Sequence, residues 1–199
     1  MSVASIPILA AMNSGEIFRQ ALPYVLLGVA LIVALDLAVS FVYRGNPSPR
    51  SKWNWWDVLV YLGTLGSVGV LGFTSLAAVV RDGVLGGWSL FVHMFGAGAF
   101  TAVLPLLALS WAHANRAELR PAGGQSSPPK FCGISKLMFW LILACGFVVT
   151  MTMLVSMLPI FGSDGQHTLL DIHRYSGLAV VVAAVLHLYG VAAQQVGLR

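Results

Sequence analysis

The residues of this sequence most capable of chemistry are two histidines within one apolar stretch. His173 and His187 lie fourteen residues apart between Thr168 and Gly190. Fourteen residues are nearly four whole helical turns, so both imidazoles point to the same side, about 21 Å apart along the axis. Ionisable side chains are costly inside a membrane and usually functional. The spacing therefore predicts a bound group, and haem, whose iron takes an imidazole on each axial face, is the leading candidate.

A third histidine, His93, lies at a matching depth in another apolar stretch. His93 and His173 are each about five residues inside a predicted span, counted from the same side of the membrane. A lone histidine is more often a packed, hydrogen-bonded residue, but two at one depth on different helices predict the axial ligands of one haem iron. Gly96 and Gly177 follow them at about one helical turn, and each is expected to leave room for a flat cofactor.

The composition places these residues in a membrane. Of the 199 residues, 58% are hydrophobic and only 9% are charged, which is far from the average of soluble domains. We therefore predict an all-α integral membrane protein with five transmembrane helices and no sizeable soluble domain. The predicted spans are residues 22–43, 58–80, 88–111, 137–160 and 168–190.

The rest of the sequence limits the cofactor chemistry. Cys132 and Cys145 belong to no Cys-x-x-Cys-His site, so any haem is expected to be non-covalent. The methionines of the fourth span could ligate iron, but methionine more often fills gaps between helices. His113 is predicted to be a solvated residue at the membrane interface, and Met1 to Met12 an interfacial segment. The methionines are Met151, Met153 and Met157.

Basic residues predict the orientation of the helices. Eight of the eleven Lys and Arg residues fall in loops or ends on one side, and three fall on the other. The positive-inside rule places the N-terminus outside and the C-terminus in the cytoplasm. The eight are Arg44, Arg50, Lys52, Arg116, Arg120, Lys130, Lys136 and Arg199, and the three are Arg19, Arg81 and Arg174.

About half of the sequence resembles a known family. The residues that carry the resemblance are Lys136-Leu-Met-Phe-Trp140, which opens one span, and the pattern Ile172-His173, Gly177, His187 and Tyr189 in the next. They are similar to the cytochrome b (gamma) subunit of membrane-bound formate dehydrogenases, among the bacterial cytochrome b561-like anchors. The resemblance runs from about Lys130 to Tyr189, and more loosely around His93.

This resemblance implies that the last four helices form a cytochrome b-type bundle. A domain of residues 55–199 would hold b haems, and residues 1–54 would add an interfacial segment, an extra helix and a turn. His93 and His173 would ligate an outer haem, and His187 an inner one. Residues 53–80 contain neither histidine nor methionine to face His187, so one haem is expected and a second stays open. Asp36 lies at about the depth of His187, and we expect the two to pair.

The function implied is electron transfer in the bacterial inner membrane. An external subunit with iron–sulfur clusters or c-type haems would exchange electrons with membrane quinone, or with another membrane subunit, through this chain. Arg174, together with Arg81, is expected to neutralise the haem propionates. Two alternatives remain open: a structural anchor with reduced or no haem function, and a proton-coupled carrier that uses Asp36 and His187 as a relay.

Overall fold

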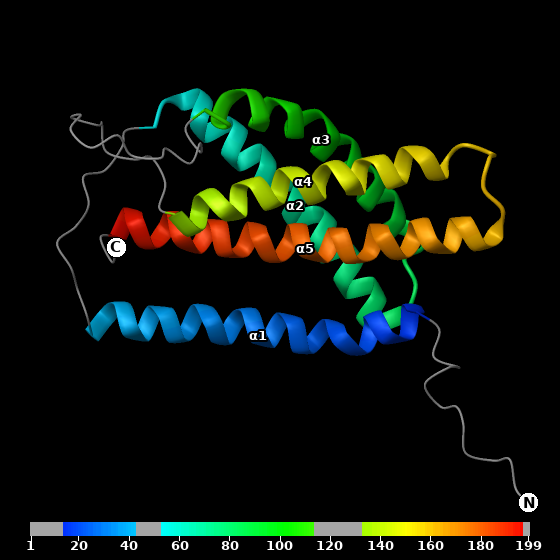
Figure 1. Ribbon diagram of the computed structural model, residues 1–199, viewed down its shortest axis with the longest axis horizontal. Helices are drawn as coiled ribbons and strands as arrows, with labels where there is room; N and C mark the ends of the chain where they lie inside the picture. Colours follow the sequence, from blue (N-terminus) through cyan, green and yellow to red (C-terminus); the bar gives the residue numbers. More distant parts are fainter. Residues whose placement is uncertain (1–13, 43–52, 114–132, 197–199) are drawn as a thin grey trace, which may run out of the picture.

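The computed structural model describes residues 14–42, 53–113 and 133–196, which form five α-helices and, within these ranges, no β-strand (Figure 1). Each helix is long and apolar enough to cross a membrane, which confirms the five predicted spans. The predicted interfacial segment at residues 1–12 and the basic residues of the first loop lie outside the described ranges. The helices are α1 (Ser14–Val42), α2 (Trp55–Asp82), α3 (Gly87–Trp111), α4 (Gly133–Ser156) and α5 (Ser163–Val196).

Local hydrogen bonds define both ends of α2. The Asn54 side chain accepts from the Asp57 backbone N–H at 2.7 Å, and the Asp57 carboxylate accepts from the Asn54 N–H at 3.3 Å. This reciprocal capping box satisfies two backbone donors that a helix start would otherwise leave unpaired. At the other end Gly83 takes a left-handed conformation with φ of 72°, and its N–H bonds to the Val79 carbonyl.

The turn between α4 and α5 lies earlier than the sequence predicts. The fourth span was expected to reach Ile160, but α4 ends at Ser156. Pro159 disfavours a helical conformation for Leu158, the residue before it, so α4 does not continue through Leu158 and ends shortly before it. The polar residues from Ser163 to His167, expected in a turn, form the start of α5 instead. The Gln166 side chain donates to the Ser156 carbonyl at 3.1 Å and ties the two helix ends together.

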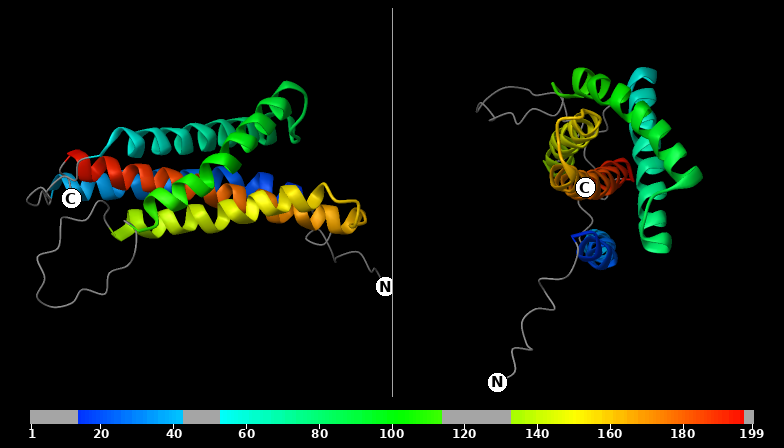
Figure 2. Two further views of the ribbon diagram at one scale, coloured as in Figure 1. Left: turned by 90° about the horizontal axis from the view of Figure 1, so that it is seen from above. Right: turned by 90° about the vertical axis from the view of Figure 1, so that its right-hand side faces the viewer.

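The last four helices are arranged as two antiparallel hairpins, α2–α3 and α4–α5, whose members pack extensively on each other (Figure 1). The two hairpins touch less, through α2 with α5 and α3 with α4. The first helix packs on α5 through Phe18, Leu22 and Leu178 and runs in the same direction as α5. In the end-on view of Figure 2, α1 lies on one side of the α4–α5 pair and the α2–α3 hairpin on another.

The apolar core fills one half of the space between the hairpins. It is built from the first half of α2 and α4 and the second half of α3 and α5, which antiparallel packing brings to the same end. Trp111 and Phe139 are its largest fully buried side chains. The Tyr61 ring stacks on Trp111 with centroids 5.4 Å apart, and the Trp53 ring meets both edge-on. The opposite half of the bundle is less filled, and the candidate site lies there.

Candidate functional site

A cavity of about 600 Å³ opens between the two hairpins, in the half of the bundle that contains the α2–α3 and α4–α5 turns. Its volume is within the range of roughly 300–1,000 Å³ typical of small-molecule and cofactor pockets. Residues of α2, α3, α4 and α5 line it, and Phe18 of α1 closes part of one side. Most of the lining is apolar, with a small number of polar groups.

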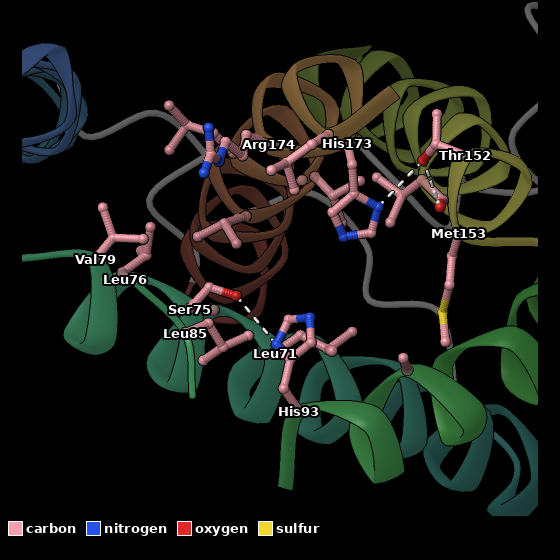
Figure 3. A pocket seen from close by; sticks show the side chains of 18 of the residues that line it. Leu71, Ser75, Leu76, Val79, Leu85, His93, Thr152, Met153, His173 and Arg174 are labelled. Atoms are coloured by element: carbon pink, nitrogen blue, oxygen red, sulfur yellow. Dashed lines mark hydrogen bonds between the residues drawn. The ribbon is translucent and has the colours of Figure 1, made fainter. Parts of the chain in front are cut away.

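The two histidines predicted to share a cofactor line this cavity from different hairpins. His93 comes from α3 and His173 from α5. In Figure 3 the two imidazoles lie across the cavity from each other, and one ring nitrogen of each points into the space between them. The structure thus brings His93 and His173 to one cavity.

Each imidazole is held by a hydroxyl group of its own hairpin. Thr74 Oγ1 and Ser75 Oγ of α2 each lie 3.1 Å from His93 Nδ1. Thr152 Oγ1 of α4 lies 3.1 Å from His173 Nδ1. All of these hydrogen bonds involve Nδ1, which leaves Nε2 as the nitrogen directed into the cavity (Figure 3).

The hydroxyl groups also select a tautomer. Thr152 Oγ1 donates its hydrogen to the Val149 carbonyl at 2.9 Å, so towards His173 it acts as an acceptor. Thr74 Oγ1 likewise donates to the Val70 carbonyl at 2.7 Å. His173 therefore carries its hydrogen on Nδ1 and keeps a lone pair on Nε2, and at His93, where Ser75 Oγ is a second neighbour of Nδ1, Thr74 favours the same tautomer. A ring oriented in this way is prepared to ligate a metal through Nε2.

The donor set suits a metal that already has other ligands. Among the described residues, no group of three or more His, Cys, Asp or Glu side chains gathers at one place. A bare zinc ion usually takes three or four protein ligands, so two imidazoles are too few for it. A haem iron has four macrocycle nitrogens and needs only two axial ligands.

The glycines predicted to flank a cofactor have different surroundings. Gly177 lines the cavity, and a Cβ atom on it would meet nothing within 4 Å. A Cβ atom on Gly96 would lie 3.1 Å from Val70 and 3.4 Å from Leu71. Gly177 therefore leaves space in the cavity, whereas Gly96 allows α3 to approach α2 closely.

His187 lies in the packed half of the bundle, apart from the cavity. Its side chain is 3% exposed, and its Nδ1 lies 2.8 Å from the backbone carbonyl oxygen of Ser135 in α4. The Tyr61 ring is its aromatic neighbour, with centroids 6.0 Å apart. His173 and His187 thus share one side of α5, as predicted, and both bond to α4. His187 does not line the cavity that contains His93 and His173.

Asp36 does not pair with His187 as expected. Its carboxylate accepts a hydrogen bond of 2.5 Å from the Tyr189 hydroxyl, two residues further along α5. This bond joins α1 to α5 at the end of the bundle away from the cavity. Asp36 thus has a hydrogen bond to a neighbouring helix, which satisfies a carboxyl group within an apolar span.

Of the two arginines expected near the propionates, only Arg174 lines the cavity. Its guanidinium Nη1 lies 3.4 Å from Asp171, and its side chain is 28% exposed. The Arg81 side chain is 86% exposed and pairs with Asp82 at 3.6 Å. His113 is exposed at the end of α3, as predicted for an interfacial residue.

The hydroxyl partners of the two histidines were not predicted from the sequence. Thr74, Ser75 and Thr152 are ordinary polar residues within apolar spans, and helical Ser and Thr commonly satisfy themselves on their own backbone. A signal was nevertheless present. Each of them lies near the same end of its span as His93 and His173, so the antiparallel order of the helices brings them to a common depth.

Comparison with known proteins adds no assignment: no protein-family model, no curated protein and no solved structure matches the chain.

Proposed function

We propose that this protein is a membrane-anchored b-type cytochrome subunit that binds one haem between His93 and His173 and passes electrons through it. One observation carries the proposal. Two imidazoles from different hairpins face each other across a cofactor-sized cavity, and hydroxyl groups bonded to both Nδ1 atoms leave Nε2 directed into it.

The residues fit a haem in three respects. His93 and His173 would hold the haem through their Nε2 atoms, and the haem would supply one-electron chemistry. The absent side chain at Gly177 leaves space beside His173. Arg174 places a positive charge at the cavity, where it would balance a propionate.

The chain's own contribution is to bind, orient and insulate. The hydroxyl groups of Thr74 and Thr152 fix the direction of each lone pair before a ligand arrives. The apolar lining excludes water and lowers the local dielectric, which tunes the reduction potential. We propose electron transfer and no catalysis by this chain alone, because a bound haem would supply the redox chemistry and the chain would position it.

We propose one haem per chain. A second haem was linked to His187, but that imidazole bonds to the Ser135 carbonyl and is enclosed by side chains. We assign His187 a structural role in holding α5 to α4.

We propose two redox partners, one at each end of the path that electrons take through this chain. The cavity is close to the turns that connect the hairpins, so a subunit with iron–sulfur clusters or c-type haems would dock at this end. Membrane quinone, or another membrane subunit, would complete the path. We propose the bacterial inner membrane as the location, with this end outside, in line with the positive-inside rule.

The first test is haem content. The chain is purified with and without His93→Ala, His173→Ala and His113→Ala, and haem b is measured per polypeptide by its pyridine spectrum. We expect about one haem in the wild type and in the His113 variant, and a loss in each of the other two. Equal haem content in all four proteins would refute the assignment of the ligands.

The second candidate function is a structural anchor that holds redox partners without a haem. The hydrogen bond of His187 to the Ser135 carbonyl favours it, because it supports a structural role for a residue that the family resemblance makes a haem ligand. A wild-type protein that binds no haem, even when haemin is added, would select this function.

A further inference from the structure

The first helix, which was expected to be an addition to the four-helix bundle, takes part in the cavity. Phe18 of α1 is 5% exposed and lines the cavity. The next residue, Arg19, extends towards the α2–α3 turn: the position that a Cβ atom would take on Gly83 lies 3.8 Å from Arg19 Nη1. Gly83 itself lines the cavity, so the Arg19 guanidinium lies at its rim.

A second guanidinium reaches the same side of the cavity from α5. The position of a Cβ atom on Gly15 lies 3.1 Å from Arg174 Nη1, so Arg174 rests against the first turn of α1. Gly15 and Arg19 are four residues apart and therefore lie on one face of α1. In Figure 3 the Arg174 guanidinium is directed to the α1 side of His173. Two positive groups from different helices thus border one edge of the cavity.

Of the two guanidinium groups at this edge, Arg174 has a carboxylate partner in the part of the chain that the structure describes, and Arg19 has none. Arg174 has Asp171 as a partner at 3.4 Å, a long distance for an ion pair. Arg19 has no ion pair or hydrogen bond among the described residues. Arg81 is already paired with Asp82 and points into solvent. The cavity edge therefore favours a ligand that carries negative charge on one side only.

We propose that Arg19 and Arg174 together bind the two propionates of the haem, so that α1 fixes the orientation of the cofactor. This inference rests on the proposed function and adds a residue and a helix to its site. Guanidinium groups are suited to this task because they form paired hydrogen bonds with carboxylates.

The test compares haem with its dimethyl ester, in which both carboxylates are blocked. Full-length protein made without haem is titrated with haemin and with the iron porphyrin dimethyl ester, and the dissociation constants are measured from the absorption spectra. The variants are Arg19→Gln and Arg174→Gln, with Arg81→Gln as a matched control on the same side of the protein. The affinity for the ester reports whether each variant keeps a folded cavity.

We expect Arg19→Gln to weaken haemin binding about 10-fold and Arg174→Gln about 10- to 100-fold, the range of hydrogen bonds to charged groups. Affinity for the ester should stay within about twofold of the wild type in both, since no carboxylate is left to bind. Arg81→Gln should change neither affinity.

Two results would overturn the inference and leave the proposed function intact. In the first, Arg19→Gln changes haemin affinity no more than Arg81→Gln. In the second, the Arg19 and Arg174 variants lose haemin and ester affinity equally. A wild-type protein that binds neither compound would instead refute the proposed function, and the inference with it.

Discussion

His173 and Thr152 are joined by a 3.1 Å hydrogen bond between Nδ1 and Oγ1, across the interface of α5 and α4. The threonine hydroxyl donates its hydrogen to the Val149 carbonyl, so it accepts a hydrogen bond from His173 Nδ1–H. A ligating imidazole depends on such a partner for its tautomer and ring orientation. The hydroxyl group of Thr152 therefore belongs to the candidate site together with the His173 imidazole that it orients.

Replacing Thr152 with valine should weaken haem binding by about 10- to 100-fold, because the valine keeps the shape and removes the acceptor. Thr150→Val is a matched control: Thr150 also lines the cavity, but its buried hydroxyl has no hydrogen-bond partner among the described residues. Haem titration of both variants checks this. Similar losses in the two variants would show that Thr152 acts through packing alone.

Arg174→Gln should lower the reduction potential of the haem. A nearby positive charge stabilises the reduced iron, which carries one positive charge less, so its removal favours the oxidised form. The side chain is partly exposed, and we expect a shift on the order of tens of millivolts. Potentiometric titration measures it, with Arg81→Gln as the control. An unchanged potential in Arg174→Gln would place this guanidinium away from the iron.

Gly177→Leu should exclude the haem without unfolding the protein. The new side chain would enter cavity space, since a Cβ atom there meets nothing within 4 Å. Gly66→Leu provides the control, because Gly66 has equally open surroundings but does not line the cavity. Haem content and thermal unfolding are compared in detergent. Full haem content in the Gly177 variant would contradict the position assigned to the cofactor.

Removing the hydroxyl group from Tyr61 and from Tyr189 should have opposite effects on the stability of the protein. The Tyr61 hydroxyl is buried without a hydrogen-bond partner in the described part of the chain, so Tyr61→Phe should raise the free energy of unfolding by about 1–3 kcal/mol. The Tyr189 hydroxyl donates to Asp36, so Tyr189→Phe should lower it by roughly 1 kcal/mol. Unfolding in detergent measures both. A loss of stability in Tyr61→Phe would contradict the unpaired hydroxyl.

The five helices could be predicted from the sequence because long apolar runs leave the chain few alternatives in a membrane. Their ends were harder to place. Residues Ser163 to His167 are polar and follow Gly162, which is typical of a turn, yet the bond from Gln166 to Ser156 holds them in α5. Such a contact between two helices leaves no periodic signal in either of them.

The candidate site was predictable in part. The depths of His93 and His173 follow from counting residues along apolar spans, and the cavity between them agrees with that count. The count gave no information on which groups surround His187. Its hydrogen bond to the Ser135 carbonyl depends on the register of α4 against α5, which hydropathy does not determine. For the same reason Gly96 was expected beside a cofactor and lies against α2 instead.

The division of the cavity between two hairpins has a consequence for assembly. His93 and its hydroxyl partners belong to α2–α3, and His173 and Thr152 belong to α4–α5, so each hairpin contains a complete and oriented half-site. Membrane hairpins can insert independently and associate later. We therefore expect each half to enter the bilayer with its imidazole already set, and a group ligated by both to fasten the halves together once they meet.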